Sequence, residues 1–211
     1  MTSVLIVDDH PIVLQGCRRV LQDRGIAPIF EARDVETGNQ LARRHQPDVI
    51  IVDLAMQGGG LSGLSLIRSI RANNPRARIL VFSMHSDPII VSRALQTGAS
   101  GYLLKDTSSE ELVRAVEGVA VGTPYLSSDL AMQVALVSAG VAHNPLAELT
   151  PRELQTLGLL AQGKSYGRIA AELNISYKTV VNLCYQLRQK LDVHTLPELI
   201  RLSVQLVPSA P

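Results

Sequence analysis

The sequence predicts a doubly wound α/β domain, with a five-stranded parallel sheet covered by helices on both faces, followed by an all-α domain. Strand-like and helix-like segments alternate five times over the first 121 residues, which is the pattern of parallel strands joined by crossover helices. From Leu149 onward the hydrophobic spacing is helical throughout. Hydrophobic residues make up 46% of the chain and aromatic ones only 3%, so both cores must be built from aliphatic side chains.

The five predicted strands are short runs of aliphatic and β-branched residues. In the first and third strands almost every residue is apolar, which is typical of parallel strands buried on both faces. The strands are predicted at residues 3–8, 26–32, 48–53, 78–82 and 101–104.

A helix is predicted after each strand, and two of these helices begin with clear capping signals. Asp87 offers an N-cap carboxylate directly before Pro88, which suits the first helical position. Ser108 and Glu111 have the spacing of a capping box. The five helices are predicted at residues 11–23, 35–45, 64–72, 88–97 and 109–121.

Gly and Pro residues separate the two domains, and an apolar stretch at residues 130–137 predicts a short helix between them. Thr150 and Glu153 form a second capping box with Pro151 at the first helical position, and Gly163 suits the end of that helix. Three more helices are predicted at residues 166–173, 177–191 and 196–206. The predicted parts are an α/β domain over residues 1–121, a linker over 122–148 and an all-α domain over 149–211.

Charge and cysteine content limit the possible functions. The formal net charge is +1, and counting along the chain gives −2 for residues 1–148 (13 basic, 15 acidic) and +3 for residues 149–211 (7 basic, 4 acidic). A small basic C-terminal domain is compatible with nucleic-acid binding. Cys17 and Cys184 are far apart, which argues against a disulfide framework and favours the reducing cytoplasm. No secretion signal or membrane-spanning stretch is recognisable, so no membrane partner is expected.

Charged side chains follow several of the predicted strands. Asp8 and Asp9 end the first strand, Asp53 ends the third, Ser83 follows the fourth and Lys105 follows the fifth. The carboxyl ends of parallel strands converge on one edge, where ligands bind. Converging carboxylates repel one another, and Mg²⁺ relieves such repulsion. A carboxylate beside the metal can attack a phosphoryl group, while an ammonium and a hydroxyl hold its oxygens.

These residues carry a family resemblance. The motifs DDH at 8–10, DL at 53–54 and GYLLKD at 101–106, together with Ser83, resemble a response-regulator receiver, which has a flavodoxin-like fold. The stretch GASGYLLKDTSSEELVRAVEGVAVGTPYLS is similar to the NarL/FixJ subfamily. The resemblance implies that a sensor histidine kinase phosphorylates Asp53. It implies a Mg²⁺ site at Asp9 and Asp53, helped by Asp8 and the Ala55 carbonyl, with Lys105 anchoring the phosphate and Ser83 and Tyr102 forming a switch.

Three positions near this site need comment. The family usually has a Pro four residues after the phosphorylated Asp, where this chain has Gln57, followed by an unusually long loop to Gly63. Its three consecutive glycines predict a mobile loop with an altered phosphate lifetime or kinase access. His10 is expected to position the first helix without a catalytic role. Cys17 is expected to be a small buried hydrophobe.

The C-terminal segment at 149–202 resembles the LuxR-type helix-turn-helix. Its motifs are the TPRE start, IAAELNIS and TVVN…KL. In the longest helix, apolar residues recur as a stripe that predicts one buried face. The opposite face would enter the major groove of DNA as a recognition helix. The predicted buried stripe consists of Val180, Cys184, Leu187 and Leu191, and Ala170, Leu173 and Ile175 are expected to pack the scaffold helix and turn.

The predicted DNA contacts are sorted by chemistry. Asn182 can read a base edge and Val181 can contact a thymine methyl group. The family often has Lys at position 181 and His at position 183, so Val181 and Leu183 predict weaker or unusual DNA binding. Cys184 is expected to pack rather than to sense redox state. The remaining candidates, expected to contact phosphates, are Lys178, Thr179, Tyr185 and Arg188.

The function predicted from these features is phosphorylation-controlled transcription regulation in a two-component system, not an enzymatic activity. Phosphorylation would change the face formed by the fourth helix, fifth strand and fifth helix, or open the domain interface. The protein would then dimerise through residues 196–206 on a two-fold-related site. A haloacid-dehalogenase-type phosphatase is rejected because Ala55 stands where its second Asp is required. A pseudo-receiver controlled by a ligand or partner stays open because of the altered loop.

Overall fold

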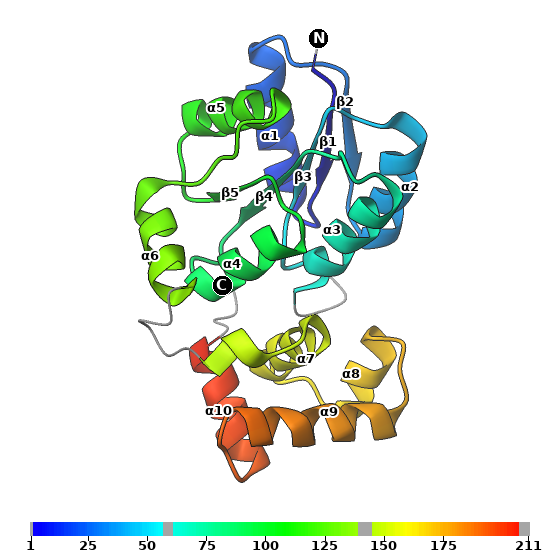
Figure 1. Cartoon of the computed structure of the whole chain (residues 1–211). Helices are drawn as coiled ribbons and strands as arrows, with labels where there is room; N and C mark the ends of the chain where they lie inside the picture. Colours follow the sequence, from blue (N-terminus) through cyan, green and yellow to red (C-terminus); the bar gives the residue numbers. More distant parts are fainter. Residues whose placement is uncertain (1, 57–60, 139–144, 207–211) are drawn as a thin grey trace.

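The fold comes from a computed structural model, which describes residues 2–56, 61–138 and 145–206. Figure 1 shows a sheet domain with helices on both faces and a separate group of helices, the helical domain. The sheet has five parallel strands in the order β2-β1-β3-β4-β5. The predicted α/β class with a doubly wound sheet, followed by an all-α domain, is confirmed.

Four strands lie within their predicted segments, and β4 extends one residue beyond its segment, to Ser83. The second strand is shorter than the prediction because Pro28 has no N–H to donate to the ladder, so pairing with β1 begins at Ile29. Ile26 lies outside the strand but is still buried in the core. The strands are β1 Val4–Val7, β2 Ile29–Ala32, β3 Val49–Val52, β4 Ile79–Ser83 and β5 Gly101–Leu104.

The sheet separates two hydrophobic cores, and helices cover each of them. On one face α1 and α5 pack against the strands through residues such as Leu14, Leu21 and Val116. On the other face α2, α3 and α4 contribute residues such as Leu66 and Ile90. Both faces are therefore covered, as Figure 1 shows, which explains why β1 and β3 consist entirely of buried apolar residues. The helices are α1 Pro11–Asp23, α2 Val35–His45, α3 Ser62–Asn73, α4 Pro88–Thr97 and α5 Ser109–Ala120.

The segment after α5 follows the free edge of the sheet before it reaches the helical domain. The Tyr102 N–H of β5 donates a 2.8 Å hydrogen bond to the Tyr125 carbonyl, and Gly101 and Tyr125 form a parallel β-bridge. Helix α6 (Ser128–Ser138) then packs against α4. The backbone of β5 is thus hydrogen-bonded to the segment that leads into the helical domain.

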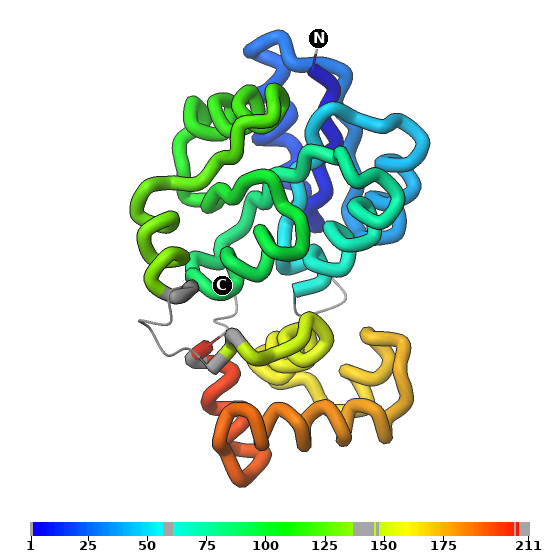
Figure 2. The backbone as a smooth tube through the Cα atoms, in the orientation of Figure 1, coloured from blue at the N-terminus to red at the C-terminus, as the bar shows by residue number. Residues whose placement is uncertain are grey.

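The helical domain contains α7 Pro151–Ala161, α8 Tyr166–Glu172, α9 Tyr177–Lys190 and α10 Leu196–Leu206, preceded by a 3₁₀ turn, η1 Pro145–Glu148. The Thr150 capping box forms as predicted, with the Thr150 N–H 2.6 Å from a Glu153 carboxylate oxygen. Every residue of α7 from Glu153 to Leu160 is buried. A helix buried all round must be covered on every side, and Figure 2 shows α7 between the sheet domain and α9.

The two domains are joined through this buried helix. Helix α7 contacts α3 of the sheet domain and both α9 and α10 of its own domain. The Arg93 guanidinium of α4 donates a hydrogen bond to the Leu149 carbonyl, just before α7. Leu149 is fully buried. Among the helices that the structure describes, none is long and apolar enough to cross a membrane.

Candidate functional site

The predicted acidic residues meet at the carboxyl edge of the sheet. Asp8 and Asp9 follow β1, and Asp53 follows the neighbouring strand β3. Each of them, together with His10, offers a ligand atom, and these four atoms all lie within 4.8 Å of one another. The side chains of Asp8 and Asp53 are each only 3% exposed. Buried carboxylates that are not paired are costly, so this edge requires cationic partners.

Lys105 supplies the positive charge. Its Nζ lies 2.7 Å from Asp8 Oδ2 and 2.9 Å from Asp53 Oδ2, and its side chain is 8% exposed. Burial alone would lower the pKa of Lys105, but the carboxylates of Asp53 and Asp8 outweigh it and raise the pKa. The ammonium therefore stays protonated and bridges the two acids.

Asp53 is only half satisfied by this bridge. Burial is the main cause that raises the pKa of Asp53, and Lys105 opposes the increase. Its second oxygen, Oδ1, is buried and has no hydrogen-bond partner among the described residues. A cavity of about 320 Å³ opens at this position, lined by Asp53, Ala55, Ser83, Lys105 and His10, among others. An unpaired buried carboxylate oxygen beside such a space fits a cation or a phosphoryl group.

Of the two predicted switch residues, Ser83 lines the cavity, and both residues form hydrogen bonds with His85 rather than with Asp53. Ser83 is fully buried, and its Oγ accepts a 3.4 Å hydrogen bond from the His85 N–H. Tyr102 is also buried, and its hydroxyl donates a 2.7 Å hydrogen bond to the His85 carbonyl. Burial raises the pKa of the Tyr102 phenol. The aromatic ring therefore already points inward in this structure.

Gly63 is a site residue that the sequence analysis did not single out. It lies in the first turn of α3, and its N–H donates a 3.0 Å hydrogen bond to the Leu54 carbonyl. A Cβ atom at this position would lie 2.2 Å from the Asp53 carbonyl oxygen. Only glycine allows this close approach, so Gly63 holds α3 against the backbone of Asp53. Gln57 and Gly58–Gly60, on which the prediction of a mobile loop rests, lie outside the described residues.

His10 is the N-cap residue of α1, but its side chain does not cap the helix. Its N–H donates a 2.9 Å hydrogen bond to Asp8 Oδ1. The imidazole Nδ1 lies 3.1 Å from Asp8 Oδ1 and 2.9 Å from Asp9 Oδ1. The ring therefore faces the carboxylates. By contrast Cys17 is a buried core residue, as predicted, and burial raises the pKa of its thiol to about 12.

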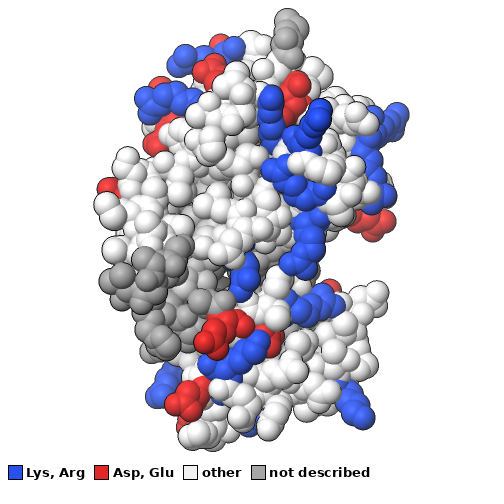
Figure 3. All heavy atoms as spheres, in the orientation of Figure 1, with Lys and Arg blue, Asp and Glu red and all other residues white. Residues whose placement is uncertain are grey.

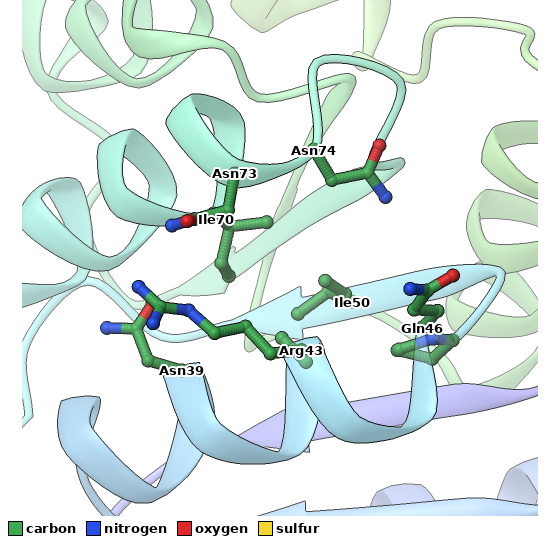
Figure 4. Close-up of a pocket in the computed structure, with 9 residues that line it drawn as sticks. Asn39, Arg43, Gln46, Ile50, Ile70, Asn73 and Asn74 are labelled. Atoms are coloured by element: carbon green, nitrogen blue, oxygen red, sulfur yellow. The ribbon is translucent and has the colours of Figure 1, made fainter.

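A second cavity, of about 450 Å³, lies between the C-terminal ends of α2 and α3. Figure 4 shows Arg43 and Asn39 of α2 on one wall, Asn73 and Ile70 of α3 on the other, and Ile50 of β3 between them. The last turns of these helices carry Arg43, Arg44 and Arg71, and Figure 3 shows several basic side chains on this side of the molecule. Basic residues are expected at helix C-termini, and none of the predicted site residues lines this cavity.

The candidate recognition helix is α9. Ser176 caps it by accepting a 3.1 Å hydrogen bond from the Thr179 N–H. The face of α9 that is predicted to contact DNA is exposed to solvent. Val181 is 39% and Tyr185 56% exposed, and Lys178 and Asn182 are exposed as well. The predicted stripe is confirmed as buried, at Val180, Cys184, Leu187 and Leu191, with Ala170 and Leu173 packed beside it and Ile175 partly buried.

Two polar contacts fix α9 in the helical domain. Lys190, at its end, lies 2.8 Å from the buried Glu153 carboxylate of α7. Burial opposes ionisation of Glu153, but hydrogen bonds from Lys190 and Thr150 lower its pKa overall. Arg188, a predicted phosphate contact, donates instead a 3.0 Å hydrogen bond to the His194 carbonyl. The sequence showed the capping box but gave no signal that Lys190 would join it.

Family comparisons agree with this architecture. Residues 4–117 match the family model of the response regulator receiver domain. Residues 147–203 match that of bacterial regulatory proteins of the luxR family. The chain is a two-component response regulator with a LuxR-type DNA-binding domain. Response regulators of this family are transcription regulators rather than enzymes, as the sequence predicts.

Similar proteins cover almost the whole response regulator. The chain is 38% identical over 198 residues to the methanol utilization control regulatory protein MoxX of Paracoccus denitrificans, covering 94% of this chain and 89% of that protein. It is 35% identical over 208 residues to the response regulator UvrY of Escherichia coli K12, covering 97% and 94%. The solved structure of RcsB from Salmonella enterica serovar Typhimurium, bound to promoter P1flhDC with phosphomimetic BeF₃⁻, has a TM-score of 0.74 and 28% identity. It covers 97% of this chain and 98% of that one.

Proposed function

We propose that Asp53 is the phosphoacceptor of this response regulator and that a sensor histidine kinase is the donor. The observation that carries the proposal is Asp53 Oδ1, which is buried next to a cavity and has no hydrogen-bond partner among residues 2–56, 61–138 and 145–206, while Oδ2 is held by Lys105. Oδ1 attacks the phosphorus of a phosphohistidine, the P–N bond breaks, and the histidine nitrogen of the kinase takes up a proton. Lys105 then pairs with the transferred phosphoryl group.

The same edge is suited to hold Mg²⁺. Asp9, Asp53 and the Ala55 carbonyl offer the oxygen ligands that Mg²⁺ prefers, and Asp8 adds negative charge. When bound, the ion neutralises charge on the phosphoryl oxygens. Asp8 also orients Lys105 through their 2.7 Å contact, so the chain itself positions the ammonium before phosphate arrives.

The signal passes from the phosphoryl group to the linker through β5. The Ser83 hydroxyl turns to the phosphoryl group and donates a hydrogen bond to it, and Tyr102 adjusts within its buried position. Because the Tyr102 N–H is bonded to the Tyr125 carbonyl, movement of β5 displaces the chain that enters α6. Helix α6 packs on α4, and α4 is bonded to Leu149 through Arg93. Phosphorylation is thereby coupled to the domain interface.

The output is DNA binding by α9 as a dimer. Figure 1 shows α9 on the side of the helical domain away from the sheet, so the sheet domain does not cover its exposed face. RcsB dimers have been solved bound to DNA, which supports the same role here. Dimerisation through α10 places two copies of α9 on related half-sites. Asn182 and Val181 contact bases, and phosphates are contacted by Lys178, Thr179, Tyr185 and, after release from His194, Arg188.

The division of labour follows the predicted parts, with the receiver at 1–121, the linker at 122–148 and the DNA-binding domain at 149–211. A regulator of promoter DNA acts in the cytoplasm, and its two thiols suit that compartment.

The test is chemical. The protein is incubated with Mg²⁺ and acetyl phosphate, a small phosphoryl donor, and its intact mass is recorded beside that of Asp53→Asn. We expect a phosphoryl adduct on the wild type and none on the variant. A folded wild type that takes up no phosphate would overturn the proposal and favour a pseudo-receiver controlled by a ligand. An adduct that persists in Asp53→Asn would place the acceptor elsewhere.

A further inference from the structure

We infer that His10 is an additional metal ligand that gives this site a preference for transition-metal ions over Mg²⁺. The inference rests on the proposed metal site at Asp53 and adds His10 to it, for which the sequence predicts only a role in positioning α1. The ligand class is a divalent ion that accepts nitrogen as well as oxygen, such as Mn²⁺, Co²⁺ or Zn²⁺.

The position of the imidazole carries the first part of the argument. Nδ1 of His10 lies 2.9 Å from Asp9 Oδ1 and 3.1 Å from Asp8 Oδ1. Ligand atoms from all three residues and from Asp53 lie within 4.8 Å of one another. A single ion can therefore contact the imidazole and the carboxylates together, with small adjustments of side-chain torsions.

A second, independent observation points to a ligand at the same place. Asp53 Oδ1 is buried and has no hydrogen-bond partner in the part of the chain that the structure describes, and both Asp53 and His10 line the cavity in front of it. The His10 side chain is 60% exposed, so an ion reaches Nδ1 without displacing the core. The ring does not cap α1, so the contacts that a bound ion would replace are those of Nδ1 with Asp8 and Asp9.

The donor set decides which ion is preferred. A site made of oxygen atoms alone suits Mg²⁺, whereas an imidazole nitrogen adds affinity for Mn²⁺, Co²⁺ and Zn²⁺. Affinity for a mixed nitrogen and oxygen site rises from Mn²⁺ to Co²⁺. His10 thus increases the difference in affinity between Mg²⁺ and the transition-metal ions, which a site made of oxygen ligands alone distinguishes less strongly.

The experiment measures metal binding without phosphorylation. Co²⁺ and Mg²⁺ are titrated separately into the full-length wild type, His10→Ala and His194→Ala, by calorimetry and, for Co²⁺, by visible absorption. His194 lies in the helical domain and is the matched control for loss of an exposed histidine. We expect His10→Ala to weaken Co²⁺ binding about 10- to 100-fold and Mg²⁺ binding less than about twofold, with His194→Ala like the wild type. Pulsed electron paramagnetic resonance of bound Mn²⁺ should show coupling to ¹⁴N in the wild type that is lost in His10→Ala.

The outcomes separate this inference from the proposed phosphorylation. Unchanged Co²⁺ affinity in His10→Ala, or no ¹⁴N coupling in the wild type, would overturn the role of His10 while leaving Asp53 as acceptor. Equal weakening of Mg²⁺ and Co²⁺ would also overturn it, because His10 would then only position the acids. If the wild type bound neither ion and took up no phosphate, the proposed metal site would be wrong, and the role of His10 with it.

Discussion

Two regions of this molecule are built to meet phosphate groups, and they do so in opposite ways. At the edge of the sheet, Asp8, Asp53 and Lys105 are buried and already paired with one another. On α9, Lys178, Asn182 and their neighbours are exposed. The first region takes one phosphoryl group at one atom, and the second is suited to many weak contacts along a DNA backbone.

The difference shows where single residues matter. Removing the shared cation of a buried charge cluster leaves its acids unpaired at high cost, so we expect Lys105 to be essential for the stability of this edge of the sheet. Substitution of an exposed residue changes the free energy of unfolding little. Substitutions on the DNA-binding face should therefore leave folding stability unchanged and weaken only DNA binding.

Substitution of the buried lysine should have the largest effect on stability. Lys105→Met leaves Asp8 and Asp53 facing each other without a cation, and we expect the free energy of unfolding of the metal-free protein to fall by about 3–5 kcal/mol. The matched control is Lys178→Met on α9, which should change it by less than about 0.5 kcal/mol. Urea unfolding in the presence of EDTA measures both. Equal losses in the two variants would remove the contrast between the regions.

The close approach of α3 to Asp53 should be the next most sensitive feature. Gly63→Ala places a Cβ atom against the backbone of Asp53, so we expect a loss of about 3 kcal/mol and slower phosphorylation. Gly16→Ala in α1 is the control, because a Cβ there meets no atom within 4 Å and should stabilise the helix by about 0.5–1 kcal/mol. Thermal unfolding of the two variants decides the matter. If Gly63→Ala left thermal stability unchanged, the close approach of α3 to the Asp53 backbone would not constrain the acceptor residue.

On α9 the expected effects are on DNA binding. Asn182→Ala should weaken binding to preferred duplexes by about 1–3 kcal/mol and relax base preference at one position. Lys178→Ala should weaken binding to all duplexes alike and reduce the salt dependence by about one phosphate contact. Fluorescence anisotropy at several salt concentrations separates the two behaviours. If both variants lost affinity uniformly, Asn182 would be another backbone contact.

The pH dependence of stability offers the subtlest test. Burial raises the pKa of Asp53 in the folded state, so the folded protein holds this proton more tightly than the unfolded chain. The associated stability is fully present below the ordinary Asp pKa of about 3.9 and is lost as the pH rises through the folded-state pKa. Asp53→Asn avoids this loss.

Without metal, Asp53→Asn should therefore be more stable than the wild type at neutral pH, by on the order of 1 kcal/mol. The advantage should shrink as the pH is lowered. Unfolding curves of both proteins at several pH values, in EDTA, give the comparison. A variant that is less stable at neutral pH would show that Lys105 fully compensates the buried charge.

Much of this architecture is predictable from the sequence because it depends on local patterns. The apolar strands, the N-cap residues Asp87 and Ser108 and the Thr150 capping box are all encoded within a few residues. The convergence of Asp8, Asp53 and Lys105 follows from parallel strands ending at one edge. Helix boundaries also agree closely, since Pro11, Pro88 and Pro151 fix where helices begin.

The remaining features depend on contacts between distant segments. The sequence identifies Gly63 only as part of a glycine-rich loop, because its 2.2 Å approach to Asp53 arises when α3 packs on the strand end. The pairing of Lys190 with Glu153 requires the end of α9 to meet the start of α7. The complete burial of α7 depends on contact with α3 of the sheet domain as well as with α9 and α10.

The central claim is that phosphorylation of Asp53 controls DNA binding by α9. It is tested most directly by selecting a duplex from a random DNA pool with the phosphorylated protein. Its affinity is then measured for the wild type with Mg²⁺, with and without acetyl phosphate, and for Asp53→Asn treated identically. We expect phosphorylation to tighten binding by about tenfold or more and Asp53→Asn to show no change. Equal affinities of the phosphorylated and unphosphorylated wild type would contradict the claim.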